Sequence, residues 1–60
     1  MSSDELIKKV KAIGWVYERT TGSHHVFEKE GEPFPLVIPH PRKDMATGTL
    51  HKLLKQAGLK

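Results

Sequence analysis

The chain has 60 residues, a net charge of +3, four histidines and no cysteine. A chain of this length buries only about 60% of its unfolded surface, so we expect one small domain over residues 1–60 without a deep substrate cavity. The lack of cysteine excludes a disulfide framework, a thiolate metal site and a cysteine nucleophile, and it suits a reducing cytoplasm. No apolar run approaches the ~20 residues of a membrane span, so we expect a soluble, unprocessed, cytoplasmic protein.

The charge is distributed unevenly along the chain. Residues 1–38 carry a net charge of −1, whereas residues 39–60 carry +4. A basic C-terminal third attracts phosphates or an acidic protein, and the charge alone does not choose between them. A solvated, lysine-rich helix face explains the same charge without any ligand.

Both ends of the chain have helical patterns. Ser2 and Glu5 fit a capping box, and the apolar residues that follow at helical spacing predict a helix over residues 3–13. Near the C-terminus, Thr47 is expected to be the N-cap of a second helix. The apolar face of that helix consists of Leu50, Leu53, Leu54 and Ala57.

The middle of the chain has strand patterns. Residues 15–20 and 24–29 are rich in β-branched and aromatic side chains, and the turn residues between them predict an antiparallel hairpin. Residues 36–38 form a third short strand, which flanking prolines favour as an edge strand. This order predicts an α+β fold in which a three-stranded antiparallel sheet carries both helices on one face and leaves the other face open.

The strongest candidate for chemistry is His24, which follows the turn residues Gly22 and Ser23. Histidine titrates near neutral pH, so an accessible imidazole can take or give a proton. RNA suits this inventory because its own 2′-hydroxyl is the nucleophile for backbone cleavage, and the protein then needs only a base and cations that hold the phosphate. By spacing alone, a histidine on a turn is more often a surface residue than a catalyst.

Other polar residues are candidates for weaker roles. His25 is expected to face away from His24, because side chains alternate along a strand. Ser23 either caps the turn or donates to a phosphate. Arg42 and Lys43 precede the second helix, whose free N-terminal amides add to the attraction for phosphate. The four histidines lack the short paired spacing and the cysteine or carboxylate companions of zinc sites, so we expect no metal.

The aromatic side chains can stack on bases, as they do in proteins that bind single-stranded RNA. They are Trp15, Tyr17, Phe27 and Phe34. A core this small needs at least two of them for packing.

Several segments occur in an order that is typical of one family. They are the Leu-Ile-Lys-Lys helix, Gly14-Trp15, the Gly-Ser-His-His turn, Pro39–Asp44, Gly48-Thr49-Leu50 and Leu53–Gly58. Together they resemble the HicA family of toxin ribonucleases almost end to end. The resemblance implies a fold like the double-stranded RNA-binding domain, in agreement with the α-β-β-β-α order above.

The resemblance also implies a function and a partner. It implies an mRNA interferase that cleaves single-stranded transcripts without the ribosome, and a cognate HicB antitoxin that covers the active surface. The histidine that matches the catalytic position is His24. Members often carry a basic residue just before the turn glycine, whereas this chain has Thr21. We therefore expect RNA contacts from Arg19, Arg42 and Lys43.

The favoured hypothesis is a toxin endoribonuclease that needs no metal or other cofactor. In it, neutral His24 takes the 2′-hydroxyl proton, and cleavage leaves a 2′,3′-cyclic phosphate and a 5′-hydroxyl. One alternative is a non-catalytic RNA-binding module that recognises A-form geometry by shape, which predicts binding without cleavage. Another is a protein-interaction domain, which predicts inertness toward RNA.

Overall fold

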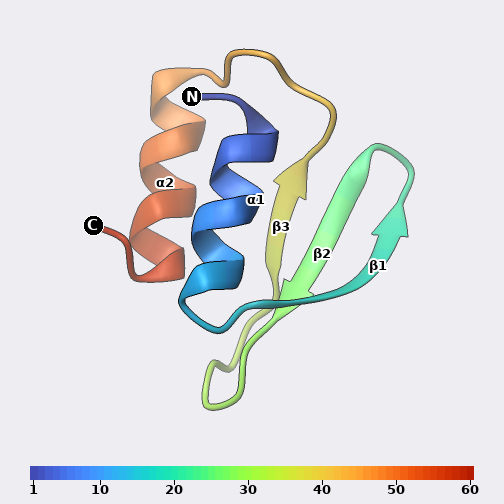
Figure 1. The fold of residues 1–60 in the computed structure, drawn as a ribbon, viewed down its shortest axis with the longest axis vertical. Coiled ribbons are helices and arrows are strands. Elements are labelled where there is room, and N and C mark those ends of the chain that lie inside the picture. The colour runs from blue at the N-terminus through green and yellow to red at the C-terminus, as the bar shows by residue number, and fades with distance from the viewer.

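The structure is a computed structural model that describes all residues, 1–60. Its elements, in chain order, are α1 (Ser3–Ala12), β1 (Val16–Thr21), β2 (His24–Glu28), β3 (Leu36–Pro39) and α2 (Thr47–Ala57), as Figure 1 shows. The three strands form an antiparallel sheet in the order β1-β2-β3. The predicted α-β-β-β-α order is confirmed, and β3 lies at an edge of the sheet. Neither helix is long and apolar enough to cross a membrane.

The first helix begins at the predicted capping box. The Glu5 amide donates to the Ser2 hydroxyl at 3.2 Å, and the Ser2 amide donates to the Glu5 carboxylate at 3.4 Å. These bonds satisfy two of the amides that a helix N-terminus leaves free. The helix ends at Ala12, and Gly14 then adopts a φ of 107°, which an L-residue rarely adopts.

The second helix begins differently from the prediction. Thr47 is its first helical residue, and the cap position is occupied by Ala46, whose side chain makes no capping hydrogen bond. The prediction that Thr47 is the N-cap is therefore wrong. The start of α2 is set by Met45, the residue before Ala46. Met45 is buried in the core, and its amide donates to the Met1 carbonyl at 3.1 Å. This anchoring fixes where the chain enters α2.

A bulge in β1 sets which side chains share a face of the sheet. Tyr17 is opposite Phe27 in the register and Arg19 is opposite Val26, with an irregularity between the two pairs. Two residue steps along β1 thus correspond to one residue step along β2. The bulge therefore shifts by one residue which side chains of β1 lie on each face of the sheet. Tyr17 lies on the same face as Phe27, and Arg19 lies on the opposite face.

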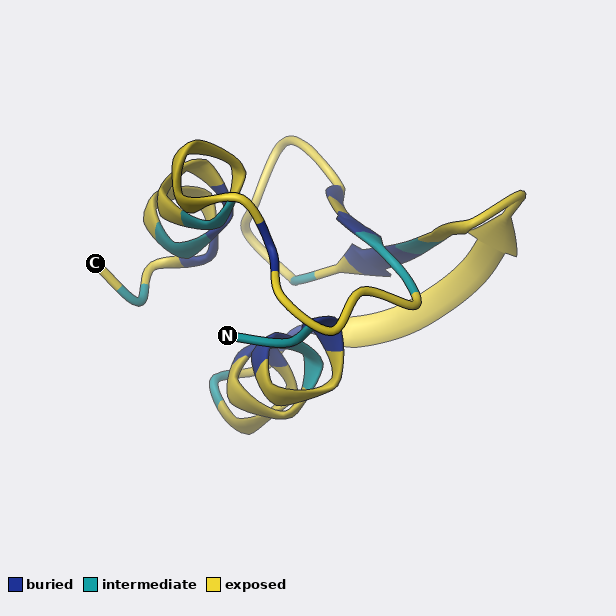
Figure 2. Cartoon of the chain, turned by 90° about the horizontal axis from the view of Figure 1, so that it is seen from above, coloured by how far each residue is buried: buried dark blue, intermediate teal, exposed yellow.

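One apolar core joins both helices to one face of the sheet. Phe27 and Leu36 are register partners on β2 and β3, and they pack with residues of both helices. The complete cluster is Leu6, Val10, Trp15, Phe27, Leu36, Ile38, Met45, Leu53 and Ala57. Figure 2 shows the buried segments of the helices turned toward the sheet. Both helices therefore cover the same face, as predicted.

The aromatic residues divide between the core and the surface. Trp15 and Phe27 are 2% and 0% exposed, whereas Tyr17 and Phe34 are 44% and 73% exposed. The Trp15 indole also donates to the Ala57 carbonyl at 3.1 Å, which ties the end of α2 to the start of β1. The expectation that at least two aromatic residues serve packing is confirmed.

Candidate active site

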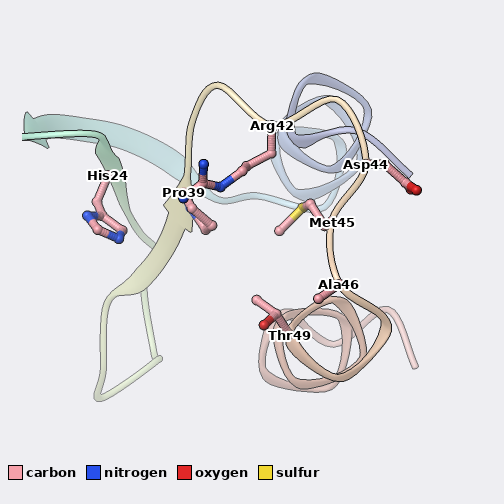
Figure 3. Close-up of a pocket in the computed structure, with 7 residues that line it drawn as sticks. All are labelled: His24, Pro39, Arg42, Asp44, Met45, Ala46 and Thr49. Atoms are coloured by element: carbon pink, nitrogen blue, oxygen red, sulfur yellow. The ribbon is translucent and has the colours of Figure 1, made fainter.

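A cavity of about 340 Å³ opens at one end of the sheet, where β2 begins, β3 ends and α2 starts. Its lining residues are His24, Pro39, Arg42, Asp44, Met45, Ala46 and Thr49 (Figure 3). They come from two strands, one helix and the segment 40–46 that joins β3 to α2, which we call the connector. The cavity thus depends on the fold as a whole.

The strand register determines where His24 points. His24 is the first residue of β2 and pairs with Thr21 on one side and Pro39 on the other. Its neighbour His25 is on the face of Phe27 and the core, because side chains two residues apart share a face. His24 is therefore exposed on the face that the helices leave uncovered. The two histidines line separate cavities, which confirms that they face apart.

The backbone of Arg42 is held by a buried serine at the start of α1. The Arg42 amide donates to the Ser3 hydroxyl at 3.0 Å, and the Ser3 amide donates to the Arg42 carbonyl at 2.9 Å. Ser3 is only 1% exposed, so little water can compete for these bonds. The side chain of Arg42 is free to act, and Figure 3 shows it extending from the connector toward Pro39 and His24.

Two further contacts anchor the connector. The His40 amide donates to the Ser23 carbonyl at 2.7 Å, which joins the connector to the turn before His24. The N-terminal ammonium of Met1 lies 3.4 Å from the Asp44 carboxylate, and in Figure 3 this carboxylate points away from His24. The Asp44 carboxylate, although it borders the cavity, is thus directed toward the N-terminal ammonium of Met1.

The first turn of α2 adds positive potential to the cavity. Ala46 offers no side-chain acceptor to the first helical amides, and this turn contains no acidic residue. Free amides at a helix N-terminus carry a partial positive charge, which favours anions. Thr49, in the same turn, lines the cavity with its hydroxyl-bearing side chain. Sequence reasoning missed Thr49, although its place in the first turn of the second helix was a usable signal.

The other residues singled out from the sequence have different positions. Arg19 shares the uncovered sheet face with His24, since its register partner Val26 lies two residues further along β2. Ser23 forms the turn and holds the connector through its carbonyl oxygen. Lys43 is exposed on the connector but does not line the cavity. The structure thus brings His24 and Arg42 into one cavity, with Arg19 on the adjoining surface.

These features define a small α+β domain in which a histidine of β2 and an arginine of the connector line one open cavity at the end of a single sheet. A family model described as the HicA toxin of bacterial toxin-antitoxin systems matches residues 3–59. The chain belongs to the HicA toxin family, and it is a toxin of a toxin-antitoxin system. The resemblance inferred from the sequence is therefore confirmed.

A solved structure supports the same assignment. The chain is similar to a chain in a structure titled "HicA3 and HicB3 toxin-antitoxin complex", with 38% sequence identity and a TM-score of 0.80. The match covers 100% of this chain and 97% of that chain. No curated protein matches the chain.

The contact between Ser3 and Arg42 leads to a test of how the site is held. Ser3→Ala removes the acceptor for the Arg42 amide, and a buried amide without a partner costs about 1–3 kcal/mol. We expect faster hydrogen exchange at the Arg42 amide, relative to amides of the β2–β3 ladder, when measured by NMR. Ser2→Ala is the matched control, because it weakens the cap of α1 but leaves the Arg42 bond intact. Equal exchange rates in the two variants would contradict this role of Ser3.

Proposed function

We propose that this toxin is an endoribonuclease that cleaves single-stranded mRNA independently of the ribosome, with His24 as its catalytic base. The observation that carries the proposal is that His24 and Arg42 line the same open cavity. A base and a cation at one accessible point are the two groups that RNA backbone cleavage requires from a protein.

The reaction is an internal transfer at phosphorus. The His24 imidazole takes the proton of the ribose 2′-hydroxyl, and the 2′-oxygen forms a bond to the adjacent phosphorus. The bond from phosphorus to the 5′-oxygen of the next nucleotide breaks, and this oxygen takes up a proton from solvent. The products are a 2′,3′-cyclic phosphate and a 5′-hydroxyl. The nucleophile belongs to the substrate, so neither a metal-bound water nor a protein nucleophile takes part.

The cations have distinct tasks in this mechanism. Arg42 lines the cavity, so its guanidinium contacts the non-bridging phosphate oxygens and stabilises the charge that grows on them in the transition state. The backbone of Arg42 is held by Ser3, so ordering Arg42 on the substrate costs less conformational entropy. Arg19 and Lys43 lie outside the cavity and bind neighbouring phosphates, whereas Ser23 contacts the phosphate beside the turn.

The position of the cavity favours a single strand as the substrate. In-line attack requires the 2′-oxygen, the phosphorus and the leaving oxygen to come into line, and a flexible single strand adopts this geometry more easily than an A-form duplex. His24 is exposed in an open cavity at the end of the sheet, so an unpaired strand can bend around it. A duplex-binding domain of this fold type spans about 16 base pairs.

The catalytic role of His24 is tested by cleavage of a labelled single-stranded RNA in the presence of EDTA. We expect wild type to cleave and His24→Gln to lose at least about 100-fold in rate, the usual contribution of a general base. His51→Gln is the matched control, since His51 is also exposed but lies outside the cavity. Equal cleavage by wild type and His24→Gln would contradict the proposal. Binding without cleavage by wild type would favour the RNA-binding module.

The role of Arg42 is tested against its neighbour. Arg42→Gln and Lys43→Gln each remove one positive charge from the connector, but only Arg42 lines the cavity. We expect Arg42→Gln to lower kcat by about 10²–10³, the range for loss of one donor to the transition state. Lys43→Gln should mainly weaken RNA binding, with a reduced salt dependence. If the two variants have the same kcat, Arg42 does not contact the reacting phosphate.

We further propose a HicB-type antitoxin as the partner, because the similar solved structure is a HicA3 and HicB3 complex. The antitoxin covers His24 and the connector with acidic or apolar side chains and thereby blocks RNA entry. Saturating antitoxin is expected to abolish RNA binding by the His24→Gln variant, measured by fluorescence anisotropy. Unchanged RNA binding in the presence of antitoxin would show that inhibition does not occur by covering the site.

A further inference from the structure

A second cavity, of about 290 Å³, lies on the other face of the sheet, between α1 and the β1–β2 hairpin. We call it the α1 groove. Its lining residues are Asp4, Ile7, Lys11, Tyr17, His25, Phe27 and His40. None of them belongs to the cavity of His24.

The α1 groove exists because the helices do not cover the whole inner face of the sheet. Both helices contact β3, whereas no residue of β1 is buried. Tyr17 is on the core side of β1, opposite Phe27, yet it remains 44% exposed. A large aromatic ring on the covered side of a sheet usually packs in the core, so its exposure leaves a stacking surface available.

Aromatic rings form one wall of the groove. The centroids of the His25 and His40 rings are 4.3 Å apart with an interplanar angle of 32°, and the centroids of Tyr17 and His25 are 5.5 Å apart. The Tyr17 ring also meets Phe27 edge-on at 5.8 Å. The rings thus support one another in fixed positions. Base stacking on such platforms is worth about 1–3 kcal/mol per base.

Polar groups from α1 form the opposite wall. One oxygen of the Asp4 carboxylate, Oδ1, lies 2.9 Å from Nε2 of the His40 ring, within hydrogen-bonding distance. The Asp4 side chain is 81% exposed, so its other oxygen is available to a ligand. Lys11 lies seven residues later, about 10 Å along the helix axis, and forms no ion pair within the chain. The groove therefore has an acceptor at one end and a free cation at the other.

These groups do not form a metal site, because no group of three or more His, Cys, Asp or Glu side chains is placed to hold an ion. We propose instead that the α1 groove is a nucleobase subsite for the RNA substrate. The base stacks on the Tyr17 ring, the free oxygen of Asp4 accepts a hydrogen bond from an exocyclic amino group, and Lys11 binds the phosphate. Guanine, adenine and cytosine carry such a group, and uracil does not.

The subsite and the cavity of His24 can belong to one RNA path. His24 and His25 are adjacent on β2, and Pro39 and His40 are adjacent at the end of β3. The two cavities therefore adjoin at this end of the sheet on opposite faces, and the α1 groove extends from there along the inner face to Phe27 and Lys11. This inference rests on the proposed function, since the ligand is a base of the strand that His24 cleaves. It deepens that function by adding a preference among bases.

The test is an NMR titration of the wild-type protein with the four nucleoside 5′-monophosphates, which have no internucleotide bond to cleave. We expect shifts of the Tyr17, His25 and His40 ring resonances with GMP, AMP and CMP. UMP is expected to bind about tenfold more weakly, since uracil lacks the exocyclic amino group that donates to Asp4 in the proposed pose. Equal affinity for UMP, absence of ring shifts with all four, or the same shifts with inorganic phosphate alone would overturn the proposal.

Matched variants separate the contributions of the ring and the cation. Tyr17→Leu should weaken GMP binding about fivefold or more through lost stacking, whereas Tyr17→Phe should bind as wild type does. Lys11→Gln should weaken binding, and Lys8→Gln, also exposed on α1, should not. A dispersed amide spectrum shows that each variant is folded. Unchanged GMP binding by folded Tyr17→Leu would overturn the proposal.

The titration tests the nucleobase subsite, and the cleavage assay tests the catalytic role of His24, so either proposal can be contradicted without the other. Cleavage that depends on His24, together with no ring shifts, would remove the subsite and leave the endoribonuclease intact. Ring shifts in the expected base order, together with cleavage that does not depend on His24, would support the subsite and contradict the catalytic role.

Discussion

The core cluster lies on one side of a three-stranded sheet, and two helices of 10 and 11 residues cover most of it, with Trp15 and Met45 from the adjoining segments. Strand side chains alternate between faces, so this one-sided covering separates His24 from His25. The uncovered face carries His24 and Arg19, both of which are exposed to solvent. The incompletely covered inner face leaves Tyr17 and His25 beside α1. Both cavities thus result from the small number of residues available for covering the sheet.

The connector converts this simple sheet into a shaped site. Residues 40–46 have no regular secondary structure, and ordering each of them costs about 1–2 kcal/mol of backbone entropy. A single hydrogen bond returns only about 0.5–1.5 kcal/mol, so several anchors are needed. Ser3, Ser23 and Met1 provide backbone bonds, and Met45 adds a buried side chain. These anchors come from distant parts of the chain, which couples the position of Arg42 to the folding of the whole domain.

Local signals in the sequence were sufficient to predict most of the fold. The capping box at Ser2, the turn at Gly22 and the prolines around β3 each act over a few residues, and each prediction from them is confirmed. The N-cap of α2 was predicted wrongly because its position depends on the burial of Met45, a long-range contact. Contacts between residues that are far apart in the sequence could not be predicted from local signals either. The bond between Arg42 and Ser3 joins residues 39 apart, and the pair of His40 and Asp4 joins residues 36 apart.

Trp15 is the single tryptophan of the chain, and it lies where the end of α2 contacts the segment before β1. Its buried indole is bonded to the carbonyl of Ala57, in the last turn of α2. Detachment of α2 from the sheet would expose this ring to water and release its N–H group. The intrinsic fluorescence of the protein therefore reports locally on helix docking, and it can register loosening at the C-terminal end of α2 while the cavity of His24, at the opposite end of that helix, is still formed.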